Sequence, residues 1–130
     1  MDKTGERIEQ ITSRFPYWFC KSYQKYIGKE QDLPFDQHWL LALLAPRPVY
    51  VASGSEDNWA DPYSEFLACV AASDAYKLLG KKGFVYEDRF IEPGEFLHDG
   101  DIGYHLRKGP HFLSRYDWQM FMRFMDKHFL

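Results

Sequence analysis

A run of β-branched and aromatic residues, Pro48 to Ser53, does most to limit the folds open to this chain. The run lacks polar alternation, which is the pattern of a central strand covered on both faces in a parallel sheet flanked by helices. A turn of small and polar residues follows. Asp61 before Pro62 then predicts a helix start, because aspartate caps helices and proline suits the first helical position. We expect this helix to run to about Leu79.

The remaining elements give a helix–strand–helix–strand–helix order, which predicts an α/β domain with few parallel strands flanked by helices. We expect helices over Thr4 to Ser13, Trp18 to Ile27 and Gln37 to Leu44, and a second strand at Ile102 to Leu106. Residues 81–100 are expected to form a loop that could hold a short strand at Phe84 to Tyr86, and a last helix follows the capping box Ser114 to Asp117. The inward positions predicted for the two long helices are Phe66, Leu67, Val70, Ala71, Leu78 and Leu79 in one, and Trp118, Phe121, Met122, Met125 and Phe129 in the other.

Two or three strands make a sheet with both edges unpaired and faces only partly covered. The sequence therefore predicts that residues 1–130 form a single but partial domain, and that an open sheet edge could pair with a second copy of the chain.

Composition excludes several classes of partner. The chain has 130 residues, 45% of them hydrophobic and 18% aromatic, so it can bury a sizeable core. A net charge of −3 argues against nucleic acid and anionic membranes, which call for a concentrated basic face. No apolar run approaches the roughly 18–20 residues of a membrane span. The polar stretch from Met1 to Gln10 predicts no signal peptide, and the compartment stays open.

Two residues placed after strands could carry chemistry. Asp57 lies just past the first strand, where open parallel sheets place catalytic groups, and His111 follows the turn Gly109-Pro110 after the second strand. A carboxylate there can orient a histidine, as in the second half of an acyl-transfer triad. Asp57 could instead simply close its turn. Trp59 could cover the neighbouring helix, or form a flat platform for a sugar ring.

The nucleophile of such a triad is not recognisable. No serine has the Gly-x-Ser-x-Gly surroundings of a strand-to-helix elbow, and Ser53 cannot precede Asp57 by a whole strand–helix unit. A zinc pair of His105 and His111 lacks a third ligand at a sensible spacing.

Several segments together resemble the bacterial glucuronoyl esterases, over nearly the whole chain. They are Gly5-Glu6-Arg7-Ile8, Phe15-Pro16-Tyr17-Trp18-Phe19-Cys20, Leu33-Pro34-Phe35-Asp36-Gln37-His38, Leu43-Leu44-Ala45-Pro46-Arg47-Pro48, Glu56-Asp57-Asn58-Trp59-Ala60-Asp61-Pro62, Gly103-Tyr104-His105-Leu106-Arg107 and Gly109-Pro110-His111. The resemblance implies the C-terminal part of an α/β-hydrolase fold whose nucleophile-bearing portion lies upstream of residue 1.

The resemblance also implies roles for four residues. His111 matches the general base, Asp57 a triad acid, Trp59 an aromatic that contacts the glucuronate ring, and Glu6 a carboxylate that hydrogen-bonds a sugar hydroxyl. An acidic residue upstream serves as the acid in many members of this family. The implied substrate is a glucuronate-containing polysaccharide ester joined to a lignin alcohol, cleaved without a metal or other cofactor by enzymes that are usually secreted or periplasmic.

The sequence is therefore compatible with three functions. The first is the histidine and acid half of a serine esterase, a fragment that is inactive alone. The second is a non-catalytic truncated module that self-associates. The third is part of a related hydrolase, of the acetyl-xylan-esterase or peptidase type, acting on another substrate.

Overall fold

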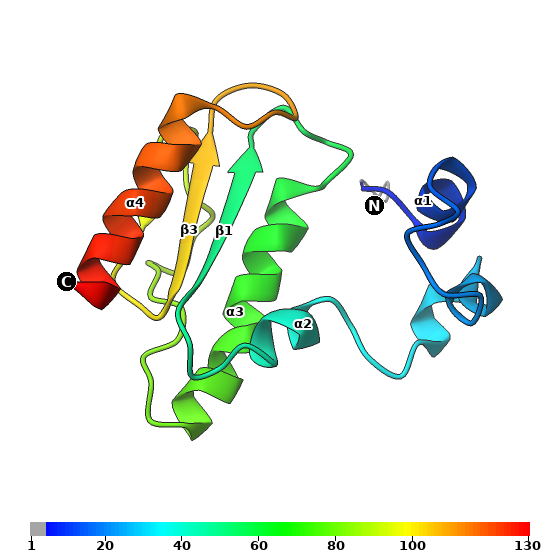
Figure 1. Ribbon diagram of the computed structural model, residues 1–130, viewed down its shortest axis with the longest axis horizontal. Coiled ribbons are helices and arrows are strands. Elements are labelled where there is room, and N and C mark those ends of the chain that lie inside the picture. The colour runs from blue at the N-terminus through cyan, green and yellow to red at the C-terminus, as the bar shows by residue number, and fades with distance from the viewer. Residues whose placement is uncertain (1–4) are drawn as a thin grey trace.

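Two parallel strands, β1 (Val49–Gly54) and β3 (Ile102–Arg107), form the main pair of the sheet in the computed structural model, which describes residues 5–130 (Figure 1). The strands predicted at Pro48 to Ser53 and at Ile102 to Leu106 are confirmed. The register pairs Val49 with Ile102 and Gly54 with Arg107, so the two strands end level at their carboxyl ends. Groups that follow these two ends are therefore brought to the same edge of the sheet.

A third strand, β2 (Phe96–Leu97), pairs antiparallel with β3 and gives the strand order β1-β3-β2. The sheet is therefore mixed, with a short antiparallel strand beside the predicted parallel pair. The expected strand at 84–86 is reduced to one parallel bridge between Phe84 and Ile102. Strand β2 was not predicted, because its two residues are too few to show a strand periodicity in the sequence. Within residues 5–130 the outer edge of β1 has no partner strand, and pairing of two copies there stays a prediction.

Helices α3 (Pro62–Leu78) and α4 (Arg115–Phe129) lie on opposite sides of the β1–β3 pair (Figure 1). Both helix starts were predicted from their caps and are confirmed. The backbone N–H of Ser64 donates to the Asp61 carboxylate at 3.3 Å, and Ser114 and Asp117 form a reciprocal capping box. Both helices are thereby fixed at the end nearest the carboxyl ends of the strands.

The faces that these helices bury differ from the predicted ones. Phe66 is buried as expected, and its ring meets that of Tyr104 edge to face at 5.5 Å. Burying such a side chain contributes about 1.5–3 kcal/mol. The other buried residues of α3 are Cys69, Ala72, Ser73 and Tyr76, whereas Leu67, Ala71, Leu78 and Leu79 are exposed. In α4 the buried residues are Asp117, Met120 and Phe124, and the predicted Trp118, Met122, Met125 and Phe129 are exposed. Apolar residues occupy more than one face of each helix, so periodicity did not identify the face that meets the sheet.

The N-terminal part contains α1 (Ile8–Arg14), the 3₁₀ turns η1 (Tyr23–Tyr26) and η2 (Glu30–Asp32), and α2 (His38–Ala42). The long helix expected from Trp18 is wrong, because only η1 forms there. The predicted start at Thr4 lies outside the described residues. In Figure 1 α1 stands apart from the sheet, on the other side of α3, and α2 packs against α3. None of the helices described is long and apolar enough to cross a membrane.

Candidate active site

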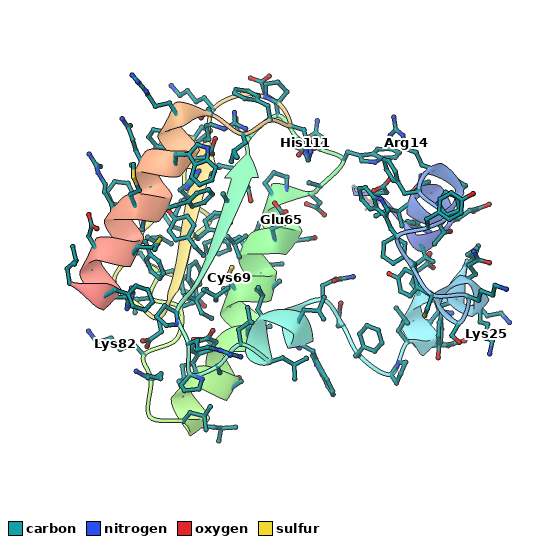
Figure 2. All side chains as sticks on the ribbon, viewed as in Figure 1. Arg14, Lys25, Glu65, Cys69, Lys82 and His111 are labelled. Carbon is teal, nitrogen blue, oxygen red and sulfur yellow. The ribbon has the colours of Figure 1, made fainter. Side chains whose placement is uncertain are left out.

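Asp57 and His111 meet at the carboxyl edge of the sheet. The Nδ1 atom of His111 lies 2.6 Å from Oδ2 of Asp57, although the residues are 54 positions apart in the sequence. The Asp57 side chain is only 10% exposed, whereas that of His111 is 87% exposed. The hydrogen bond therefore fixes the Nδ1 edge of the imidazole and leaves the rest of the ring open to solvent. Figure 2 shows His111 beyond the carboxyl end of β1, near Glu65 on the first turn of α3.

The backbone explains why these two residues meet. The loop after β1 and the loop after β3 are joined by hydrogen bonds from Ser55 N–H to the Arg107 carbonyl, 2.8 Å, and from Glu56 N–H to the Gly109 carbonyl, 3.1 Å. Gly54 permits this approach, since a Cβ there would lie 2.8 Å from the Gly109 oxygen. The two loops are therefore held as one unit.

Asp57 also closes its own turn. Its Oδ1 accepts a hydrogen bond from the backbone N–H of Ala60 at 3.2 Å, and its backbone carbonyl accepts another from the same group at 3.1 Å. The structural and the functional interpretation of Asp57 are therefore compatible. A carboxylate already fixed by its turn can hold an imidazole in one tautomer and stabilise the imidazolium that forms during proton transfer.

Trp59 and Glu6 lie together beside this pair. The backbone N–H of Glu6 donates to the Trp59 carbonyl at 2.7 Å, and the Trp59 side chain is about half exposed. Gly5 allows the contact, because its φ of +95° is costly for other residues and a Cβ there would lie 3.1 Å from Cβ of Asp61. Residues 5–6 are thus attached to the turn that carries Asp57.

A cleft of about 1290 Å³ opens between the N-terminal part and helix α3. Its lining includes Glu6, Arg7, Tyr63 and Ser64. The Oε1 atom of Glu6 is buried and has no hydrogen-bond partner among the described residues. Because a buried polar atom without a partner costs free energy, Glu6 is suited to accept a hydrogen bond from a ligand hydroxyl.

The serines near His111 are engaged elsewhere. The hydroxyl of Ser53 donates to Oε2 of Glu65 at 2.5 Å, and the hydroxyl of Ser55 accepts from Gly109 N–H at 3.3 Å. Burial raises the pKa of Glu65, an effect that the Ser53 hydrogen bond opposes. Among the residues described, no serine hydroxyl is hydrogen-bonded to His111.

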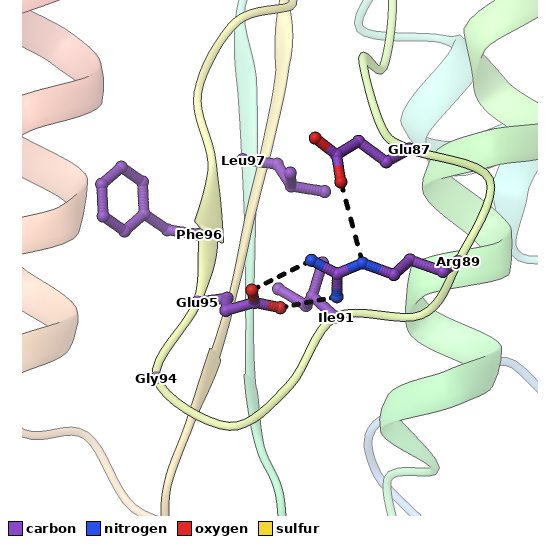
Figure 3. A pocket seen from close by; sticks show the side chains of 7 residues that line it. All are labelled: Glu87, Arg89, Ile91, Gly94, Glu95, Phe96 and Leu97. Carbon is purple, nitrogen blue, oxygen red and sulfur yellow. Dashed lines mark hydrogen bonds and ion pairs between the residues drawn. The ribbon is translucent and has the colours of Figure 1, made fainter.

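A second cavity, of about 400 Å³, lies against β2 and the loop before it (Figure 3). Arg89 forms two hydrogen bonds with Glu95, of 2.8 and 3.0 Å, and a longer ion pair with Glu87. The charge of Arg89 is neutralised by these carboxylates, so the cavity has no free cation for an anionic ligand. We do not regard it as a catalytic site.

A buried chain of polar groups lies between the sheet and α4, and the sequence did not predict it. The Tyr50 hydroxyl contacts Nε2 of His98 at 2.7 Å and Nδ1 of His105 at 3.0 Å, and Nε2 of His105 contacts Asp117 at 2.8 Å. All three bonds are satisfied if both histidines are neutral and protonated on Nε2. His105 and His111 therefore have separate partners, and no group of three or more metal-ligating side chains occurs among the described residues.

His98 should make the chain sensitive to acid. Burial lowers the pKa of His98 to about 4, and the neighbouring His105 adds to this shift. The unfolded chain, with a histidine pKa of about 6.5, then binds more protons than the folded chain below neutral pH. Stability should fall by up to about 3 kcal/mol as the pH falls from 6.5 towards 4.

The matched variant for this prediction is His98→Gln, whose amide can still donate to Tyr50 but does not titrate. Urea denaturation at a series of pH values should show a shallower loss of stability for the variant than for the native chain. Equal slopes would contradict the assignment to His98.

A carboxylate and a histidine at the carboxyl ends of neighbouring parallel strands, with helices on both faces, is the arrangement of the second half of an α/β-hydrolase site. A family model described as "Glucuronyl esterase, fungi" matches residues 1–80, more than half of the chain. The chain therefore belongs to the glucuronoyl esterase family.

Individual relatives agree with this assignment. Carbohydrate esterase MZ0003, from an unknown prokaryotic organism, is 44% identical over 95% of this chain. A CE15 esterase from a marine bacterial metagenome, described as promiscuous, superposes with a TM-score of 0.91 at 44% identity over 96% of the chain. The glucuronoyl esterase from Solibacter usitatus superposes with a TM-score of 0.88 at 40% identity over 98% of the chain.

The matches cover only part of each relative. The chain spans 28% of MZ0003, and 31% and 32% of the two solved structures. The expected likeness to part of an α/β-hydrolase of the glucuronoyl esterase family is confirmed.

Proposed function

We propose that this chain supplies the general base and an acid of a serine-type esterase that acts on glucuronoyl esters. The observation that carries the proposal is the 2.6 Å contact between Nδ1 of His111 and the Asp57 carboxylate. The domain that contains it would be partial, with the nucleophile provided by residues that are not among these 130.

In the complete enzyme a serine would attack the ester carbonyl, and His111 would take its proton on Nε2. The same proton then passes to the leaving alcohol, and the steps repeat with water as the nucleophile. Asp57 keeps the Nδ1 proton in place and stabilises the imidazolium. An acidic residue elsewhere in the enzyme could share this task, as the resemblance implies.

Trp59 and Glu6 would hold the sugar. The half-exposed indole of Trp59 offers a flat apolar surface to the glucuronate ring, and the buried Oε1 of Glu6 would accept a hydrogen bond from a ring hydroxyl. The backbone hydrogen bond from Glu6 to Trp59 supports their action as one unit, since it holds together the two backbone segments that carry these side chains.

A chimera tests the proposal. The matching segment of carbohydrate esterase MZ0003 is replaced by residues 1–130, and hydrolysis is measured on the methyl ester of glucuronate and on acetyl and aryl esters. We expect the chimera to cleave the glucuronate ester, and the isolated chain to cleave none of them above background, because removing a triad nucleophile costs most of the rate acceleration.

The outcomes separate the alternatives. A folded chimera without activity would contradict the catalytic proposal and favour the non-catalytic module. Cleavage of acetyl esters but not of the glucuronate ester would contradict the substrate. Turnover by the isolated chain that disappears in His111→Ala would mean that one of these 130 residues is the nucleophile.

A further inference from the structure

Arg107 binds the loop that carries His111 from inside. It is the last residue of β3 and is 6% exposed. Its Nη1 donates to the Lys108 carbonyl at 2.8 Å, and its Nη2 donates to the carbonyls of Pro110 and Phe112 at 2.8 and 2.7 Å. The carbonyls of the residues immediately before and after His111 are thus both held by one nitrogen atom.

Asp117 fixes the guanidinium itself. The Nε atom of Arg107 lies 3.2 and 3.1 Å from the two oxygens of the Asp117 carboxylate. That carboxylate also accepts from the backbone N–H and the hydroxyl of Ser114 and from His105. Burial alone would raise the pKa of Asp117, but these hydrogen bonds and the charge of Arg107 lower it to about 2. The Asp117 carboxylate that holds Arg107 is therefore ionised across the pH range in which enzymes usually work.

The Phe112 ring completes the enclosure, because the guanidinium carbon of Arg107 lies 3.9 Å from the centre of that ring. A lysine could pair with Asp117 but could not reach three carbonyls and stack at the same time, because its ammonium is a single point of charge. The arrangement thus uses the planar fork of arginine rather than its charge alone.

We propose that Arg107, anchored on Asp117, is a positioning residue that fixes the 108–112 loop so that Nδ1 of His111 faces Asp57. The hydrogen bonds of Arg107 go to Asp117 and to the carbonyls of Lys108, Pro110 and Phe112, so it acts through the backbone on both sides of His111. The catalytic purpose of this arrangement rests on the proposed function, but the arrangement itself can be measured without a substrate.

The test is nitrogen-15 NMR of the imidazoles of the full 130-residue chain at about pH 8, where an unperturbed histidine is neutral. In the native chain His111 should carry its proton on Nδ1 and give a downfield, slowly exchanging Nδ1–H signal. In Arg107→Lys this signal should be lost, and the Nε2-protonated tautomer should predominate while the circular dichroism stays native. Arg89→Lys is the matched control, since Arg89 also pairs with a carboxylate but lies in the loop beside β2.

A native His111 signal in folded Arg107→Lys would overturn the proposal. If that variant does not fold, the guanidinium signals of Arg107 in the native chain test the proposal instead. A held guanidinium should give separate Nη–H signals, with hydrogen-bond couplings to the carbonyls of Pro110 and Phe112, and one averaged signal would overturn the proposal. An inactive chimera with a native His111 signal would refute the proposed function and leave the role of Arg107 intact.

Discussion

His111→Ala should abolish glucuronate ester hydrolysis by the chimera, with kcat reduced by about 10⁴- to 10⁶-fold. Among the described residues, the His111 imidazole is the only group hydrogen-bonded to the Asp57 carboxylate that could move a proton between the nucleophile and the leaving alcohol. The loss should fall on kcat rather than on KM, because Trp59 and Glu6, the proposed sugar contacts, stay in place. Initial rates over a range of substrate concentrations measure both constants.

His38→Ala is the matched control for this variant. His38 begins α2, its ring contacts that of its neighbour Trp39, and we assign it no part in the reaction. The kcat of the His38→Ala chimera should stay within about twofold of that of the parent chimera, as expected for a substitution of small energetic effect. Retention of activity by a folded His111→Ala chimera would show that another group acts as the general base.

Asp57→Asn should cost about 10⁴-fold in kcat, the scale of a triad whose histidine loses its orienting carboxylate. An amide that donates to Nδ1 would favour the tautomer with its proton on Nε2, which cannot accept the serine proton. The fold should persist, since the amide oxygen can still accept the hydrogen bond from Ala60 that closes the turn.

Glu56→Gln is the control for Asp57→Asn, because Glu56 is an exposed carboxylate in the same turn. A rate for Asp57→Asn close to that of Glu56→Gln would mean that an acidic residue outside these 130 residues holds His111. Such a result would contradict the role of Asp57 without removing that of His111.

The central elements of the fold were predictable because their signals are local. The apolar runs gave β1 and β3, and the caps at Asp61 and Ser114 gave the starts of α3 and α4. The two-residue β2 was not predictable, since its existence depends on β3 as a partner. Nor were the buried faces of α3 and α4, because the sheet selects one of several apolar faces on each helix.

The candidate site also contains residues that could be predicted from the sequence and residues that could not. Asp57 and His111 could be proposed from sequence because each follows a recognisable strand, and the level ends of β1 and β3 bring them together. Arg107 and Asp117 were missed, since their roles depend on contacts between a strand, a loop and a helix. The sequence did contain one signal for Arg107. It is a charged residue that ends the strand Ile102–Arg107, in which the only other strongly polar residue is His105.

The central claim is that Asp57 and His111 act as one catalytic unit in this chain. The most direct test is the kcat of the double variant Asp57→Asn/His111→Ala in the chimera, beside each single variant. Members of a unit are not additive, so we predict that the double variant is no slower than His111→Ala alone. A double variant slower by the product of the two single effects would contradict the claim.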